Sequence, residues 1–316
     1  MSDAGRFDSA GASLRFDTVT FLSDYGRTDE FVGVVHSVIR QMAPGVGVVD
    51  LTHDVPAFDV RSAGLTLARS AQYVCPGVIL AVVDPGVGTP RRPIAVEVAG
   101  GRAVFVGPDN GLLAPAVGMI GGAERAVVLD RPEYHLEAPG PTFAGRDVFA
   151  PVVAHLCLGV GFDEVGTPVD TTTLMPGTLP ITHAEGDQLT CEVLWIDHFG
   201  NVQLNVDPDE LEGWGDRITI TVEERNRVGR RAGTYAEIGV SEIGLVVDSY
   251  GLVSLAANRV SAAETLGLGE ADEVRLIRIP DDGGVEDEGG DRDRAVTTSV
   301  ALGRRSPPRD RSSEGA

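Results

Sequence analysis

The sequence predicts two domains: an α/β N-terminal domain with a Rossmann-like layered sheet, and a small all-β barrel after it. Up to about residue 165, short apolar runs alternate with segments of helical periodicity, which is typical of parallel strands joined by helices. From residue 188 onward, strand-like runs follow one another without helices between them, which is typical of a barrel or a sandwich. The expected parts are a flexible arm (1–16), the α/β domain (17–165), a linker (166–187), the barrel (188–280) and a disordered tail rich in acidic residues and arginine (281–316).

Each element of the α/β domain is predicted by a local pattern. Short β-branched runs bounded by turn residues indicate buried strands, and apolar residues at helical spacing indicate helices. Asp59 has the position of an N-cap before the second helix. The predicted strands are 18–22, 46–51, 78–83, 94–98 and 103–107, the last two as a hairpin-like pair, and the predicted helices are 31–42, 59–73 and 148–160.

Three aspartates follow predicted strands of this domain. Asp24, Asp84 and Asp109 each stand where an apolar run gives way to a glycine-containing turn. Ligands of open α/β sheets bind outside the carboxyl ends of the strands, so we expect the three carboxylates to gather at one edge as a polar site. Arg91 follows Asp84 across a glycine-rich loop and is expected to pair with it. A surface turn with a simple salt bridge explains the same spacing.

Two turns of the predicted barrel carry polar residues. Asp197 and Asn201 belong to the segment DHFGN, and Ser249 and Tyr250 belong to DSYG. Both segments fit hairpin corners, and both fit a binding site. The predicted barrel strands are 189–196, 217–222, 243–247, 253–255 and 274–279.

The charge of the chain excludes one class of partner. The net charge is −21, and all 26 basic residues other than histidine are arginine. An acidic surface argues against nucleic acid as a partner. It fits either a cationic ligand or adaptation to high salt, and we favour the second. No apolar run has the length of a membrane span and no signal pattern begins the chain, so we expect a cytoplasmic protein without a membrane partner.

Cysteine and histidine give no metal motif. The three cysteines are scattered, without the C-x-x-C spacing of a zinc knuckle. His53 follows a predicted strand, but no second histidine or cysteine stands at metal-ligand spacing from it. We therefore expect a hydrogen-bonded loop histidine and no metal site.

Several segments in a fixed order resemble one family, the S-adenosylmethionine hydroxide adenosyltransferases, whose halide-using relatives are the fluorinase and chlorinase. Each segment alone is a weak signal, whereas the set from about residue 18 to about residue 279 is specific. The matching segments are FLSDYGRTDEFVG, VVDLTHDVPAFDVRSA, AVVDPGVGTPRR, VGPDNGLL, TFAGRDVFAP, IDHFGN and DSYGLVSLAANRVSAAETLGL.

The resemblance implies a fold and a reaction. The family combines an N-terminal α/β domain with a C-terminal β-barrel and forms a trimer, with the substrate between domains of neighbouring subunits. Water or hydroxide attacks C5′ of S-adenosyl-L-methionine, so that adenosine and L-methionine form. S-adenosylmethionine is the substrate, and no cofactor is implied.

The resemblance also assigns roles to individual residues. Asp84 and Arg91 match the catalytic aspartate and arginine, which orient the attacking water. Asp24 matches the aspartate that binds the ribose hydroxyls, and Phe58 the aromatic residue beside the sugar. In the barrel, Asp197 matches the group that binds the methionine ammonium. The other implied binding residues are Asp29, Glu30, Phe31, Phe143, Gly145, Asn201 near the adenine, Ser249 at the methionine carboxylate, and Tyr250, which replaces an arginine of the fluorinase.

Two departures from the family pattern point in opposite directions. The halide enzymes have tyrosine at Asp84, and the fluorinase has a long insertion before the PDNG turn. Aspartate without that insertion favours water as the nucleophile. The hydroxide enzymes, however, have histidine in the loop TFHGRD, where this chain has Ala144. Three hypotheses follow in order of preference: a hydrolase, a chloride-using adenosyltransferase, and a non-catalytic protein that binds S-adenosylmethionine or adenosine.

Overall fold

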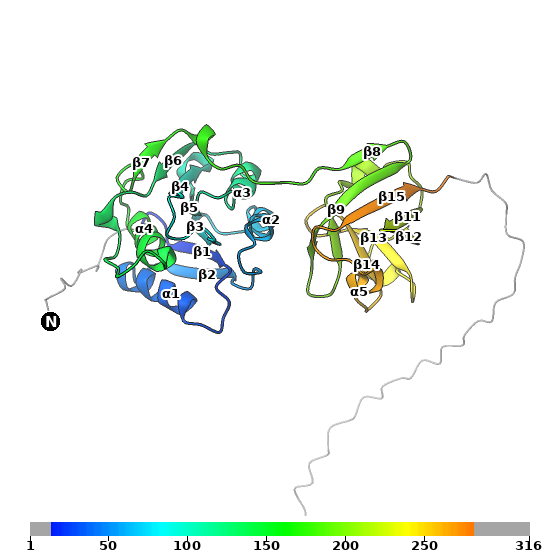
Figure 1. The fold of residues 1–316 in the computed structure, drawn as a ribbon, viewed down its shortest axis with the longest axis horizontal. Helices are drawn as coiled ribbons and strands as arrows, with labels where there is room; N and C mark the ends of the chain where they lie inside the picture. Colours follow the sequence, from blue (N-terminus) through cyan, green and yellow to red (C-terminus); the bar gives the residue numbers. More distant parts are fainter. Residues whose placement is uncertain (1–13, 281–316) are drawn as a thin grey trace, which may run out of the picture. The chain divides into compact units, whose positions relative to one another are not determined.

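The N-terminal domain contains a seven-stranded mixed sheet in the order β2-β1-β3-β5-β4-β6-β7 (Figure 1). The computed structural model describes residues 14–280, so the predicted tail and most of the predicted arm lie outside the described residues. The first four strands in this order run parallel, and the other three are antiparallel to their neighbours. The strands are β1 (Thr18–Ser23), β2 (Gly47–Thr52), β3 (Gly77–Val82), β4 (Pro93–Val98), β5 (Ala103–Pro108), β6 (Arg125–Val128) and β7 (Thr167–Val169).

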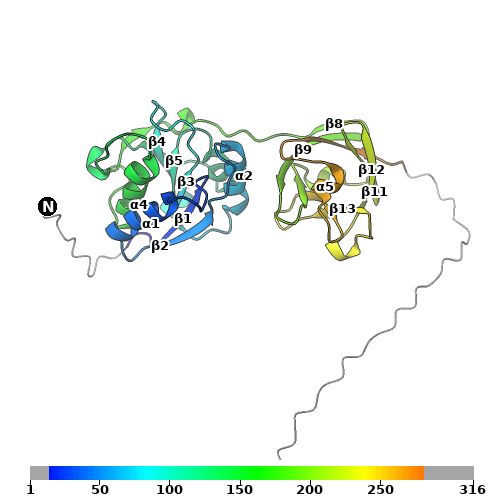
Figure 2. The ribbon, with the colours of Figure 1, turned by 60° about the horizontal axis from the view of Figure 1, so that its bottom comes forward.

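Helices cover both faces of this sheet, which gives the three layers expected of an α/β domain (Figure 2). Helices α1 (Phe31–Met42) and α4 (Ala150–Cys157) pack on one face, and α2 (Val60–Ser70) and α3 (Ala114–Met119) pack on the other. Every residue of β3 is buried, as its continuous Val/Ile/Leu run requires. The end of β3 is therefore a fixed position at the centre of the sheet.

Helix α2 begins as the sequence predicts. The Asp59 side chain accepts a hydrogen bond from the Ser62 amide at 2.9 Å, which satisfies a backbone donor that the first turn leaves unpaired. Helix α1 differs in its first turn. Asp29 and Glu30 precede the helix, and Glu30 is its N-cap residue without a side-chain capping bond.

The C-terminal domain is a closed seven-stranded barrel. The strands follow the order β10-β14-β13-β12-β11-β15-β9, and β9 pairs again with β10 to close the ring. Alternate residues of β9, Leu189, Cys191 and Val193, point into the barrel core. The strands are β9 (Gln188–Ile196), β10 (Val202–Leu204), β11 (Arg217–Val222), β12 (Arg225–Arg231), β13 (Ile243–Val247), β14 (Val253–Ala257) and β15 (Glu273–Arg278), with helix α5 (Ala262–Leu266) and strand β8 (His183–Glu185) added to them.

Short elements depart from the predicted plan. Strands β7 and β8 lie within the range predicted as a linker, where β7 pairs with β6 and β8 pairs with β9. Strands β6, β10 and β12 and helices α3 and α5 were not predicted. Between residues 14 and 280, no helix is long and apolar enough to cross a membrane.

Candidate active site

Asp84 and Arg91 form a charge pair beside the end of β3. Arg91 Nε donates to Asp84 Oδ1 at 2.8 Å, and Arg91 Nη2 donates to the other carboxylate oxygen. The two side chains are only 7% and 14% exposed. The loop between them turns back through a hydrogen bond from the Thr89 hydroxyl to the Gly86 carbonyl, at 2.7 Å. The pairing expected from the spacing is therefore formed, and its geometry is bidentate.

A cavity of about 330 Å³ lies beside this pair. Asp84 and Asp24 both line it, because β3 and β1 are adjacent parallel strands and their carboxyl ends meet at one edge. Glu30 is the one predicted binding residue of this domain that is absent from the lining. The predicted residues that line it are Asp24, Asp29, Phe31, Phe58, Asp84, Phe143 and Gly145.

The Asp24 carboxylate holds the loop that carries Phe58. Its Oδ2 accepts a hydrogen bond from the Phe58 amide at 2.9 Å. Phe58 has a φ of 69°, a left-handed conformation that is costly for an aromatic residue, and its side chain is 72% exposed. Within residues 14–280, Asp24 Oδ1 has no hydrogen-bond partner. One oxygen therefore fixes the loop while the other stays available to a ligand hydroxyl.

Three aromatic rings form one wall of the cavity. The centroids of Tyr25, Phe31 and Phe143 lie 5.0–5.7 Å apart. Gly145 makes room for this packing, because a Cβ there would stand 2.2 Å from the Tyr25 hydroxyl. Burial, reinforced by the Asp24 and Asp84 carboxylates and opposed by Arg91, raises the pKa of Tyr25 well above its ordinary value. The phenol is thus neutral at physiological pH. Tyr25 is a lining residue that the sequence analysis did not single out, although it directly follows Asp24.

Ala144 separates this cavity from a second, larger one. It precedes the π-helical turn η3 (Gly145–Phe149) that leads into α4. The second cavity measures about 480 Å³, and Ala144 and Arg91 both line it. A methyl group thus stands where the family pattern has an imidazole, with open space on two sides.

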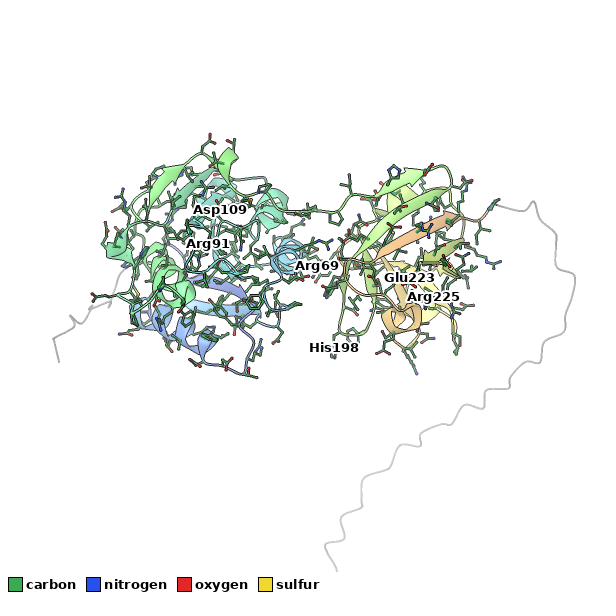
Figure 3. All side chains as sticks on the ribbon, in the orientation of Figure 1. Arg69, Arg91, Asp109, His198, Glu223 and Arg225 are labelled. Carbon is green, nitrogen blue, oxygen red and sulfur yellow. The ribbon has the colours of Figure 1, made fainter. Side chains whose placement is uncertain are left out.

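Asp109 does not join the other two aspartates, which corrects the expectation of three carboxylates at one site. Its Oδ2 accepts from Arg92 Nε at 2.7 Å, and its Oδ1 accepts from the Met175 amide at 2.8 Å. Arg92 also donates to the Thr173 carbonyl at 2.6 Å. Asp109 therefore anchors the segment after β7 to the end of β5. Figure 3 labels Asp109 and Arg91 in the N-terminal domain.

The predicted barrel residues lie in two turns, one between β9 and β10 and the other between β13 and β14. Asp197 Oδ2 accepts from the Asn201 amide group at 2.8 Å, and Asp197 Oδ1 accepts from two backbone amides of its own turn. Tyr250 is 40% exposed and packs its ring edge-on against Trp195. Ser249 is exposed in the same turn. Strand β10, which follows the first turn, pairs with β14, which follows the second, and Gln203 of β10 donates a 2.7 Å hydrogen bond to Asp248 of the second turn.

Comparison with known proteins agrees with both domains. The family model described as the SAM hydroxide adenosyltransferase N-terminal domain matches residues 19–166, and the model for the C-terminal domain matches residues 191–275. The chain belongs to the SAM hydroxide adenosyltransferase family. The resemblance drawn from the sequence motifs is thereby confirmed.

Members of this family with curated functions match most of the chain. An (R)-S-adenosyl-L-methionine hydrolase of Salinispora tropica is 41% identical over 82% of this chain and 97% of its own length. One from Thermus thermophilus is 42% identical over 82% of this chain and 99% of its own. A fluorinase of Actinopolyspora mzabensis is more distant, at 28% identity. A crystal structure of a conserved protein from Thermotoga maritima aligns with a TM-score of 0.77 and 31% identity, covering 82% of this chain and all of that one.

Proposed function

We propose that the protein hydrolyses S-adenosyl-L-methionine to adenosine and L-methionine by attack of water at C5′. The observation that carries the proposal is the bidentate Asp84–Arg91 pair, which borders a cavity also lined by Asp24. The identities support it as well, since the relatives named as hydrolases are 41% and 42% identical and the fluorinase is 28% identical.

The reaction requires little acid–base catalysis from the protein. The water oxygen bonds to C5′ while the C5′–S bond breaks and its electron pair goes to sulfur, which leaves as the neutral thioether of methionine. A sulfonium needs no proton to leave, so the one proton to be moved is that of the water. The Asp84 carboxylate accepts it, with lone pairs left over from its bonds to Arg91. Positioning of that water supplies the rest of the catalysis.

The lining of the cavity fits the substrate. The free oxygen of Asp24 is available to a ribose hydroxyl. Phe31, Phe58 and Phe143 offer apolar faces to the sugar and base, and Phe58 is positioned by the same Asp24 carboxylate. Two carboxylates beside the cavity attract a cationic sulfonium, and that attraction is lost when the neutral product forms.

The finer parts of the proposal rest on the family resemblance. They are a homotrimer with sites between subunits and a reaction without a cofactor. A cytoplasmic location is proposed as well, as the sequence analysis expects. Asp197, Asn201, Ser249 and Tyr250 are proposed to bind the methionine and adenine parts of the substrate. The hydrogen bond from Gln203, in the strand that follows the Asp197–Asn201 turn, to Asp248, in the turn of Ser249 and Tyr250, supports that assignment.

A chloride-using transferase is the second candidate, and one observation favours it. Ala144 leaves open volume beside Arg91, where an anion has room and a positive partner. Asp84 opposes it, because a carboxylate repels an anionic nucleophile. We therefore rank this activity below hydrolysis.

A product assay separates these activities. The purified chain is incubated with S-adenosylmethionine, once in chloride and once in a non-halide salt, and the nucleosides are separated by chromatography. Adenosine in both salts is the expected result. A chlorinated nucleoside that forms only in chloride would replace hydrolysis by halide transfer. Retained substrate binding without either product would leave a binding protein, the third hypothesis of the sequence analysis. Because the relatives are named for the R epimer, each sulfonium epimer is assayed separately.

A further inference from the structure

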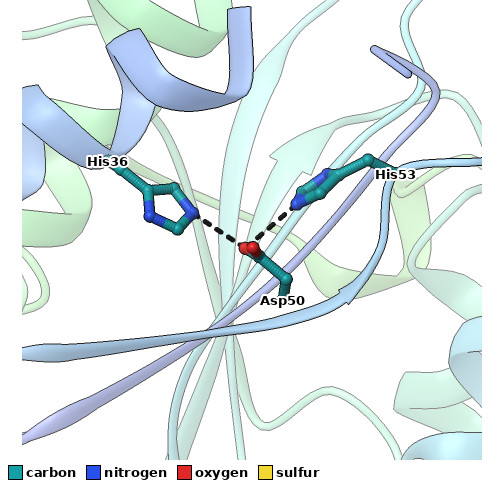
Figure 4. Close-up of side chains that lie close together, drawn as sticks. All are labelled: His36, Asp50 and His53. Atoms are coloured by element: carbon teal, nitrogen blue, oxygen red, sulfur yellow. Dashed lines mark hydrogen bonds and ion pairs between the residues drawn. The ribbon is translucent and has the colours of Figure 1, made fainter. Parts of the chain in front are cut away.

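Two histidines and an aspartate from separate elements meet at the edge strand of the N-terminal sheet. His36 belongs to α1, Asp50 to β2, and His53 to the loop that follows β2. His36 Nε2 lies 2.8 Å from Asp50 Oδ1, and His53 Nε2 lies 3.0 Å from the same oxygen (Figure 4). All three potential ligand atoms fall within 4.8 Å of one another. Among the described residues, this is the one histidine, cysteine and carboxylate group with such spacing.

The buried nitrogen of His53 is the informative atom. The His53 side chain is fully buried, and its Nε2 makes no hydrogen bond of acceptable direction, although the Asp50 oxygen is 3.0 Å away. A buried polar atom without a partner is costly unless something satisfies it. The atom faces the same carboxylate oxygen that His36 reaches (Figure 4). The three groups therefore converge on one point, and the lone pair of His53 Nε2 is available to bind a ligand there.

The other side of the His53 ring is already fixed. Its Nδ1 is 2.7 Å from the Ser23 hydroxyl, which also accepts a bond from the Tyr25 amide. The ring packs against Phe21 with a centroid separation of 4.7 Å. A histidine that ligates through Nε2 typically donates its Nδ1 proton to such an oxygen, which fixes the tautomer and the ring orientation.

We propose that His36, Asp50 and His53 bind a divalent transition-metal cation of the zinc class. Two imidazoles and one carboxylate are a donor set that zinc accepts in four-coordinate sites with one open position, whereas magnesium prefers oxygen ligands. Ligand atoms of a tetrahedral zinc site lie about 3.3 Å apart, since each bond is about 2.0–2.1 Å long. The observed separations reach that geometry by small side-chain rotations. His36 and Asp50, 34% and 29% exposed, give the cation a route of entry.

The cation would act on the fold near the catalytic edge without touching the reaction. His53 reaches Ser23 through its hydrogen bond, and Ser23 directly precedes Asp24. The His53 carbonyl also accepts the Gly26 amide at 2.8 Å, on the far side of Asp24. Binding of the metal to His53 therefore stabilises the turn that carries Asp24.

The test uses the full chain after removal of metal with a chelator. Titration with Co²⁺ is followed by its visible absorption, Zn²⁺ is added in competition, and Mg²⁺ is titrated as the oxygen-preferring comparison. We expect one cobalt per chain with the spectrum of a four- or five-coordinate nitrogen and oxygen site, displacement by zinc, and no effect of magnesium. Thermal unfolding should shift upward with zinc.

Three variants locate the site. His36→Gln and Asp50→Asn should each weaken zinc binding at least about tenfold, because loss of a ligand costs no less than loss of an outer-shell partner. His183→Gln removes an exposed histidine of β8 outside the cluster and should bind as the parent does. Equal zinc affinity in the parent and in both cluster variants, or no cobalt spectrum in the parent, would overturn the site and leave a hydrogen-bond network. Adenosine formation is measured in parallel and does not decide this question.

Discussion

Arg91 and Arg92 are adjacent in the chain, and each pairs with an aspartate at the end of a parallel strand. Asp84 follows β3 and Asp109 follows β5, and both carboxylates are largely buried, at 7% and 4% exposure. By sequence, by strand position and by burial of the carboxylate the two pairs are alike. They differ in what else their atoms contact.

The Asp109–Arg92 pair is saturated by the protein itself. Asp109 accepts the Met175 amide with its second oxygen, and Arg92 donates to both the carbonyl and the hydroxyl of Thr173. Each of these bonds ties the segment after β7 to the sheet. The pair therefore works as a structural clamp.

The Asp84–Arg91 pair has hydrogen-bond donors and acceptors that the described residues do not use. Within the described residues, the only side chain to which Arg91 donates is Asp84, and its guanidinium otherwise lies against the ring of Phe149 at 5.5 Å. Asp84 lines one cavity, Arg91 lines a second, and Ala144 lines both. Comparison of the two pairs indicates that unused donors and acceptors facing a cavity, rather than a buried ion pair as such, mark the reactive site.

The largest predicted effect is on turnover when Asp84 loses its charge. Asp84→Asn keeps the shape of the side chain but removes the base, so adenosine formation should fall about 10²–10⁴-fold, the usual contribution of a positioned acid–base group. Steady-state kinetics measure the rate, and calorimetry with S-adenosylmethionine measures binding, which should persist. Turnover equal to that of the parent would remove Asp84 from the mechanism.

The matched variant Asp109→Asn should lower stability and leave turnover unchanged, the opposite of what is expected for Asp84→Asn. It weakens a charge-assisted bond to Arg92, so the free energy of unfolding should drop by about 1.5–3 kcal/mol. The turnover number of the folded protein should not change. Denaturant unfolding and kinetics on the same preparation check both statements, and a large loss of turnover at unchanged stability would make the two pairs functionally alike.

The elements that could be predicted from the sequence are those with a clear hydrophobic pattern. The apolar run of β3 predicts a buried strand, and the apolar stripe of α1 predicts a helix. The alternation of such strands and helices predicts the parallel part of the sheet. Strand β12, RNRVGRR, was not predicted because arginine, asparagine and glycine fill every position except Val228, so the segment shows no apolar alternation. Strands β7 and β8 escaped because each has three residues in a region rich in proline and threonine. Pairing with neighbouring strands, rather than local pattern, defines these elements.

The candidate site was predictable only in part, for a related reason. Adjacent strands bring Asp24 and Asp84 together, and that follows from topology. The structural role of Asp109 depends on its hydrogen bond from the Met175 amide, 66 residues away in the chain, and no local sequence pattern indicates that contact. The group of His36, Asp50 and His53 escaped for the same reason, because α1 must pack beside β2 before the ligand atoms meet.

The third prediction concerns the substitution of histidine for Ala144, where the two cavities meet. Ala144→His restores the loop TFHGRD and fills open volume beside Arg91, so it should raise the rate of adenosine formation by about tenfold or more if an acid–base group is what the parent lacks. Ala144→Leu fills a comparable volume without a titratable group and serves as the control. A rise with both variants would assign the gain to packing, and no rise with histidine would mean that Asp84 and Arg91 hold the water unaided.

The smallest predicted effect concerns Tyr25, which lies against the same reactive pair without taking part in proton transfer. Because burial and two carboxylates raise its pKa, the phenol keeps its proton between pH 6 and 9, and turnover of Tyr25→Phe should stay within about threefold of the parent, with a superimposable pH profile. Stability should respond instead. A folded-state pKa above the unfolded value of about 10 means that the parent loses stability as the pH rises beyond 10, and Tyr25→Phe should lose less. A parent rate that climbs with pH and flattens in the variant would identify Tyr25 as a base and extend the reactive pair to three residues.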